Sequence, residues 1–98
     1  MNVRFTLHNV IFEWDNRKAV INFRNHEVSF ELACDAFFDP FVCYLGDEVI
    51  DGELRETIVG LTSTWQLLFV VYVKREDIIR VVSARVVTKA EREAYENQ

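Results

Sequence analysis

The stretch "LLFVVYV", from Leu67 to Val73, is apolar at all seven positions and is the longest apolar run in the chain. It is far shorter than the roughly 18 residues of a membrane-spanning helix, and its β-branched and aromatic residues favour a strand. A strand without alternating polar positions is typical of the centre of a sheet, where both faces are covered. The sequence therefore predicts a sheet built around this segment.

Two more strand-like runs lie on either side of it. Thr57 to Thr62 precede it and Ile78 to Ala84 follow it, and the central strand itself is predicted from Gln66 to Val73. The intervening gaps, "STW" and "KRED", are short enough for hairpins. We expect an antiparallel meander in the second half of the chain.

The first half begins with a strand that leads into a helix. Val10 to Trp14 combine β-branched and aromatic side chains, which favours a short strand. Asp15 is a good N-cap and no Gly or Pro follows it closely, so a helix is predicted from about Asn16 to Arg24. Val3 to His8 either add another strand or lengthen this one.

A second helix has clear signals at both ends. Ser29 is a candidate N-cap, and the apolar residues after it recur at i, i+3, i+4 and i+7. Asp39-Pro40 ends this helix, because the residue before a proline avoids the helical conformation. Phe41 to Leu45 then predict a strand, and "GDEVIDGE" predicts an acidic connecting loop.

The last helix completes the predicted fold. A capping box from Thr88 to Glu91 begins it, and it extends to about Glu96. The predicted order is β-α-α-β-β-β-β-α, with helices packed on a largely antiparallel sheet. Because 98 residues suffice for a single core only, we expect one α+β domain covering residues 1–98.

The charge limits the ways in which the protein could bind nucleic acid. A net charge of −5 argues against binding through the whole surface. Residues 51–98 hold eight acidic and seven basic side chains, so that half is nearly neutral. A phosphate-facing patch should therefore be local and mostly C-terminal.

The sequence also predicts the compartment. Its first residues are too short and too mixed for a signal peptide, and no apolar run is long enough to span a membrane. Cys34 and Cys43 lack a spaced pattern, which favours two reduced core thiols. We expect a cytoplasmic protein.

Arg80 and Arg85 stand near the end of a mainly apolar strand. In a regular strand they would point to opposite faces, so they share a face only if the strand bulges or ends between them. Each could point to solvent or pair with an acid such as Glu13 or Glu91. Alternatively, at least one binds phosphate, for which the planar fork of Arg is suited.

Lys18, Asn22 and His26 are spaced i, i+4 and i+8, so they would line one side of a sufficiently long first helix. Lys and His together could serve phosphoryl chemistry, with one side chain holding charge and the other moving a proton. His26 could equally cap the helix C-terminus, where a cation is favourable.

The remaining polar and aromatic residues give weaker indications of a functional site. The acids around Asp47 to Glu53 lack the ligand pattern of a calcium loop, which favours a solvated loop. Trp14 and Trp65 fit either a core position or base stacking. Neither a Gly-rich phosphate loop nor zinc-type Cys and His spacing is present.

The chain resembles the BrnT family, toxins of a type II toxin–antitoxin system with a RelE-like ribonuclease fold. The matching segments are "FEWDNRKAVINFRNHEVSFELA" from Phe12, "FFDP" ending at Pro40, the strand from Arg55 to Gly60, and "IRVVSARVVTKAEREAYE" from Ile79. Within the last segment, the Ser-Ala-Arg, Thr, Glu-Arg and Tyr-Glu positions occur at the family's intervals.

This resemblance implies a metal-independent endoribonuclease that inhibits translation. It implies a cognate antitoxin, BrnA, with a ribbon-helix-helix DNA-binding part, and contact with operator DNA only through that antitoxin. Cleavage would occur by attack of a ribose 2′-hydroxyl on the adjacent phosphate. The candidates for stabilising the negative charge on the phosphate are Arg55, Arg80 and Arg85, with Lys18 in support. His26 would act as base or acid, and Tyr95 and Glu13 are further candidates.

The chain departs from the family pattern in two places. The common Lys-His-Gly is Asn25-His26-Glu27 here, which removes a positive charge and a glycine beside the histidine. The common Arg-Gly turn after the central strand is Arg75-Glu76. Two alternatives to the nuclease therefore stay open: a catalytically weak or inactive module that binds the antitoxin, and a plain partner-binding domain whose arginines form ion pairs.

Overall fold

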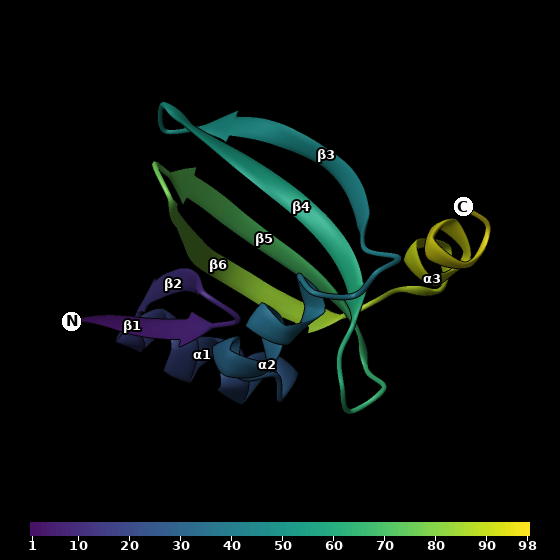
Figure 1. The fold of residues 1–98 in the computed structure, drawn as a ribbon, viewed down its shortest axis with the longest axis horizontal. Helices are drawn as coiled ribbons and strands as arrows, with labels where there is room; N and C mark the ends of the chain where they lie inside the picture. Colours follow the sequence, from purple (N-terminus) through teal and green to yellow (C-terminus); the bar gives the residue numbers. More distant parts are fainter.

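The computed structural model describes all residues from 1 to 98 and shows an α+β fold (Figure 1). A single six-stranded mixed sheet has the strand order β1-β2-β6-β5-β4-β3. The elements are β1 (Asn2–Leu7), β2 (Val10–Asp15), α1 (Asn16–His26), α2 (Phe30–Ala36), β3 (Cys43–Ile50), β4 (Glu53–Leu61), β5 (Leu67–Arg75), β6 (Ile78–Val86) and α3 (Lys89–Glu96).

The predicted meander is confirmed. β4, β5 and β6 pair antiparallel in sequence order, and β5 lies in the interior of the sheet. The one parallel pair joins β2 to β6, with Glu13 opposite Arg80. The predicted order has one strand before the first helix, whereas the structure has two. Val3 to His8 belong largely to the additional strand, β1, which pairs antiparallel with β2 through a turn at His8 and Asn9.

All three predicted helix starts are correct. The side chains of Asp15, Ser29 and Thr88 each accept a hydrogen bond from a backbone N–H in the first turn of the helix that follows. α1 is longer than predicted and ends at His26, where Glu27 adopts a left-handed conformation with φ 58°. A side chain is strained in that conformation, which is why glycine is favoured there.

The predicted loop "GDEVIDGE" is wrong. β3 continues through these residues to Ile50, and β4 begins at Glu53. Asp51 and Gly52, both with positive φ, form the whole connection, and Asp-Gly is a strong signal for such a two-residue hairpin turn. Acidic residues are poor strand formers, but pairing with β4 along its length overrides that preference.

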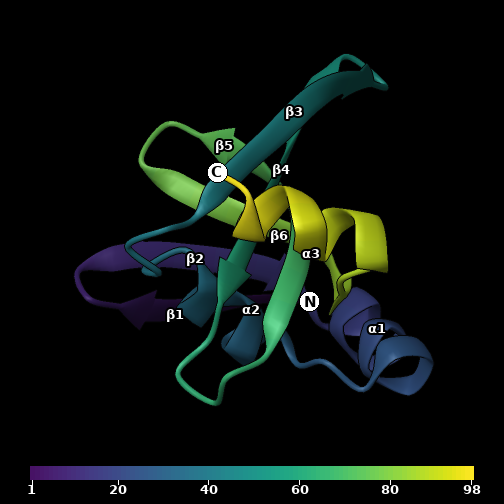
Figure 2. The same cartoon turned by 90° about the vertical axis from the view of Figure 1, so that its right-hand side faces the viewer.

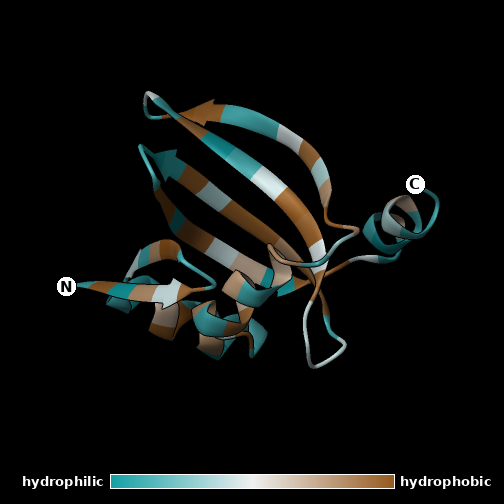
Figure 3. Ribbon diagram, viewed as in Figure 1, coloured by the Kyte–Doolittle hydropathy of each residue, from teal (hydrophilic) through white to brown (hydrophobic).

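The core lies between α1, α2 and one face of the sheet. Phe12, Trp14 and Phe30 are almost fully buried there, together with Leu68 and Val70 of β5. Figure 3 shows β5 as mainly hydrophobic until its C-terminal end. Trp14 is therefore a core residue, whereas Trp65 is exposed in the β4–β5 turn.

The short helix α3 lies apart from the other two helices, as Figures 1 and 2 show. It contains no buried residue. Its side-chain attachments are ion pairing between Glu91 and Arg85 and a hydrogen bond from Tyr95 to Asp39. None of the three helices is long and apolar enough to cross a membrane.

Candidate functional site

A β-bulge decides which face of the sheet the arginines of β6 occupy. Ser83 pairs with Val71 and Val81 pairs with Tyr72, so Val82 is an extra residue in β6. One extra residue reverses the alternation of side chains along a strand. Arg80 and Arg85 consequently point to the same face, the one opposite α1 and α2, together with Ser83.

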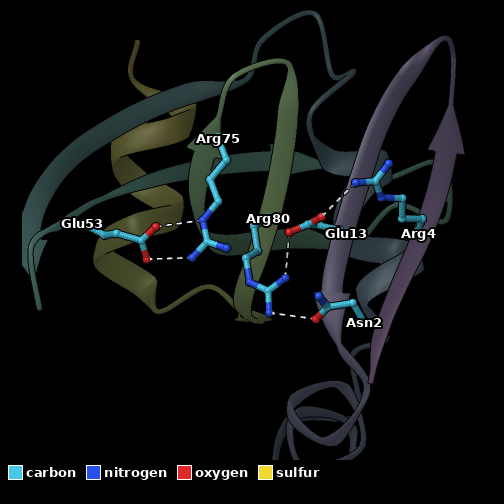
Figure 4. Close-up of polar contacts among 6 residues, drawn as sticks. All are labelled: Asn2, Arg4, Glu13, Glu53, Arg75 and Arg80. Carbon is cyan, nitrogen blue, oxygen red and sulfur yellow. Dashed lines mark hydrogen bonds and ion pairs between the residues drawn. The ribbon is translucent and has the colours of Figure 1, made fainter.

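Arg80 lies in a row of charged residues that crosses this open face. Its guanidinium donates to Glu13 at 2.8 Å and to Asn2 at 3.2 Å. Glu13 also faces Arg4 at 3.8 Å (Figure 4). The side chain of Glu13 is only 11% exposed, and that of Arg80 is 18% exposed, so this pair is held firmly in place.

Arg85 is held by the helix α3. It donates two hydrogen bonds to the carboxylate of Glu91, at 2.8 and 2.9 Å, and its guanidinium lies 4.0 Å from the centre of the Phe69 ring. The hydrogen bonds from Arg85 lower the pKa of Glu91, and the same bonds raise the pKa of Arg85. Arg85 is therefore oriented and fully charged.

Arg55 differs from the other two arginines because it has no ion pair and no side-chain hydrogen bond. Extending the register of β4 and β5 places it beside Val73, whose other neighbour is Arg80. Arg55 lines a cavity of about 480 Å³ on the open face, which Ser83 and Phe69 also line. The cavity extends from β3 to Ser83 of β6, and neither Arg80 nor Arg85 lines it. Glu48, the direct cross-strand neighbour of Arg55 on β3, is part of its wall.

Lys18 and His26 lie on α1 beside β6, in a different cavity from Arg55. A smaller cavity, of about 200 Å³, is lined by Lys18, His26 and Ser83. Ser83 lines both cavities, which makes them neighbours. His26 is also the last residue of α1, so its position suits a helix cap as well as the cavity.

Asn22 fixes this arrangement, a role that the sequence did not indicate. Its amide donates to the carbonyl oxygens of Val28 and Ala84 and accepts from the N–H of Ala84. β2 pairs with β6 only as far as Arg80, so Asn22 takes the place of a neighbouring strand. α1 is thereby attached to β6 beside Ser83.

The two remaining candidates lie outside the cavities. Tyr95 donates to Asp39, and burial together with this hydrogen bond raises its pKa to about 12. Glu13 is committed to Arg80 and Arg4. Arg75, which pairs with Glu53 at 2.8 Å on the same side as Arg80, was not among the predicted site residues (Figure 4).

A mixed sheet with α1 and α2 on one face and arginines on the other defines a small α+β fold whose open sheet face carries guanidinium groups. Such a surface suits phosphate groups. A family model described as "Ribonuclease toxin, BrnT, of type II toxin-antitoxin system" matches residues 14–91. The chain therefore belongs to this family.

A solved structure supports the fold. The chain is similar to the ribonuclease toxin BrnT of Brucella abortus, known from a crystal structure at 1.1 Å resolution. The TM-score is 0.52 and the identity 17%, and the match covers 78% of this chain and 94% of that one. At this identity the likeness concerns the fold alone. The comparison with curated proteins found no match.

Proposed function

We propose that the chain is a metal-independent endoribonuclease toxin that cleaves RNA in the cytoplasm and so inhibits translation. The observation that carries this proposal is Arg55, a guanidinium that makes no ion pair, although Glu48 lies opposite it, and that lines a cavity on the face shared with Arg80 and Arg85. Family membership supports the reaction class. A RelE-like assignment of the fold belongs to the same proposal.

The proposed reaction needs a base, an acid and cations. A base removes the proton of a ribose 2′-hydroxyl, whose oxygen then bonds to the adjacent phosphorus while the bond to the 5′-oxygen breaks. An acid returns a proton to that 5′-oxygen. Arg55, Arg80 and Arg85 stabilise the negative charge that grows on the phosphoryl oxygens, Lys18 supports them, and His26 serves as base or acid.

The ion pairs of Arg80 and Arg85 are compatible with phosphate binding. A guanidinium has five N–H donors, and Glu91 engages only two of those of Arg85 while Val86 receives a further contact. Glu13 and Asn2 likewise use only part of Arg80. The acids hold each guanidinium in one orientation, and the unused donors are available to phosphate oxygens.

The test is expression of the chain alone in bacteria, followed by an RNA cleavage assay with purified protein. We expect growth arrest, and we expect Arg55→Ala to lower the cleavage rate about 100-fold, as for the loss of one donor to a transition-state oxyanion. Arg17→Ala, which removes an exposed arginine at the start of α1, is the matched control and should cleave normally. Equal activity of Arg55→Ala and the parent would remove Arg55 from the mechanism.

A second candidate function is a weak or inactive module that binds the antitoxin. The observation that favours it is the neutralisation of two of the three arginines by Glu13 and Glu91. Absence of both growth arrest and RNA cleavage from the parent chain would support this alternative.

The partner is part of the proposal. We infer an antitoxin encoded beside the chain, of the BrnA type, with a ribbon-helix-helix part that contacts operator DNA. Membership of a type II toxin–antitoxin family supports this inference. Finding a neighbouring reading frame whose sequence has a ribbon-helix-helix pattern would support the inference.

A further inference from the structure

Part of the helix-covered face of the sheet has no helix on it. α1 and α2 pack mainly against β6 and its neighbours, whereas β3 packs substantially only on β4. In Figure 1, β3 and the adjacent end of β4 extend away from both helices. We call this uncovered area, formed by the helix-side residues of β3 and β4, the outer surface.

The outer surface is apolar and leads into a cavity. Tyr44 and Val49 of β3 and Leu54 of β4 are 51%, 68% and 46% exposed, and Val49 lies directly opposite Leu54. Tyr44 also lines a cavity of about 370 Å³ whose other walls include Phe37 and Tyr72. Nine of the ten residues around this cavity are hydrophobic, so it suits apolar side chains of another molecule.

Two carboxylates lie opposite each other on the outer surface. Asp47 of β3 is the direct cross-strand partner of Glu56 of β4. Like charges at such positions are destabilising, and neither carboxylate has a Lys, Arg or His nitrogen within 4.0 Å. The hydroxyl of Tyr44 donates to Asp47 at 2.6 Å, which fixes that carboxylate without neutralising it. The pair therefore offers a site for a cation from outside the chain.

We propose that the outer surface binds a segment of the antitoxin that carries apolar side chains and at least one Lys or Arg. The apolar side chains enter the cavity beside Tyr44, and the cationic group lies between Asp47 and Glu56. This inference rests on the proposal that an antitoxin neutralises the chain. It adds the surface used and the chemistry of the segment that occupies it.

Charge selects this occupant over the alternatives. A second copy of the chain would present the same surface in a symmetric contact, and would bring another Asp47 and Glu56 to it. Each copy also has a net charge of −5. RNA phosphates would meet the same two carboxylates, so neither occupant relieves the repulsion.

The test uses the protein encoded by the reading frame beside the chain's own, purified and titrated against the chain by calorimetry. Val49→Asp with Leu54→Asp places charges on the apolar part and should weaken binding 30-fold or more, as expected for the centre of an interface. Both positions are exposed, so the variant should fold, which urea unfolding checks. Val20→Asp with Phe23→Asp, at positions of α1 that are 51% and 54% exposed, is the matched control and should bind as the parent does.

A second variant tests the charge. Glu56→Lys supplies an internal cation for Asp47, competes with the partner's cation, and should weaken binding about tenfold. Glu93→Lys, an exposed position of α3, makes the same change elsewhere and should have no effect. Unchanged binding in both outer-surface variants would overturn the proposal, as would a stable dimer of the chain alone that Val49→Asp with Leu54→Asp dissociates.

Growth arrest separates this proposal from the proposed function. Both outer-surface variants should still arrest growth when expressed alone, and should escape rescue by the neighbouring protein. If the parent binds that protein through the outer surface but never arrests growth, the docking proposal stands and the ribonuclease proposal fails. If the parent arrests growth and every variant is rescued equally, the ribonuclease proposal stands and the docking proposal fails.

Discussion

Replacing Asn22 with Ala tests the link between α1 and β6, on which the positions of Lys18 and His26 depend. The Asn22 side chain makes three hydrogen bonds to backbone groups, at 3.0, 2.9 and 3.1 Å. Asn22 is only 6% exposed. The substitution therefore leaves backbone groups of Val28 and Ala84 without partners in the interior.

The expected loss in the free energy of unfolding follows from those three hydrogen bonds. Each hydrogen bond contributes about 1 to 1.5 kcal/mol net, and the three together about 3 to 4.5 kcal/mol. The higher helix propensity of Ala offsets about 0.5 kcal/mol. We expect the free energy of unfolding to fall by about 3 kcal/mol, a large part of the roughly 5 to 15 kcal/mol that stabilises a domain.

Urea unfolding followed by circular dichroism measures the change. With a slope of about 1.5 kcal/mol per molar urea, the midpoint should fall by about 2 M. Asn25→Ala makes the same substitution at an exposed position of the same helix, and should change stability by no more than about 0.5 kcal/mol. A loss below about 1 kcal/mol for Asn22→Ala, at an unchanged slope, would refute the reasoning.

Three further changes test other parts of the structure. Gly60→Ala should lower the free energy of unfolding by about 1 to 3 kcal/mol in the same assay, because the new Cβ would clash with the backbone carbonyl of Ala36. Glu27→Gly should raise it by about 1 kcal/mol, because the left-handed conformation at that residue strains any side chain. Glu91 has a lowered pKa in the folded state through its bonds to Arg85, so it stabilises the fold above its ordinary pKa of about 4.3 and loses that contribution as the pH falls. Glu91→Gln should therefore reduce the loss of stability between pH 6 and pH 3, measured by urea unfolding at each pH.

Each of these changes has a control or a contrary outcome. For Gly60→Ala, a change within 0.5 kcal/mol would mean that α2 moves away freely. Glu93→Gly lies inside a helix and should be destabilising by about 1 kcal/mol, the opposite sign to Glu27→Gly. Glu93→Gln should leave the pH dependence of stability as it is in the parent. If Glu91→Gln changed that pH dependence no more than Glu93→Gln does, the role of the Arg85–Glu91 pair would be contradicted.

Local chemistry explains which elements could be predicted. The helix starts at Asp15, Ser29 and Thr88 depend on hydrogen bonds within a few residues, and all three are correct. The second half of β3 was missed because its acidic residues are poor strand formers on their own. The Asp51-Gly52 turn carried the missing signal, since it pairs the two flanking runs as a hairpin.

The candidate site also has features that the sequence indicated and features that depend on the fold. Arg80 and Arg85 could be singled out by their place near the end of an apolar strand, and the resemblance to a family added Arg55. Regular alternation along a strand predicted opposite faces for Arg80 and Arg85. The bulge at Val82 unites the two β6 arginines on one face, and nothing in the residues around it predicts an extra unpaired residue. The acidic partners of the two arginines differ in their separation along the sequence. Glu91 is six residues from Arg85, whereas Glu13 is 67 residues from Arg80.

The sequence by itself determined the α+β class, the central position of the apolar strand and the helix caps, because apolar periodicity and capping act over neighbouring residues. Only the tertiary structure decided that Arg80 is neutralised by Glu13 through the parallel β2–β6 contact and that Arg55 lines a cavity without making an ion pair. These outcomes depend on strand pairing and register between residues far apart in the chain. A shift of a single position in register would send each side chain to the opposite face.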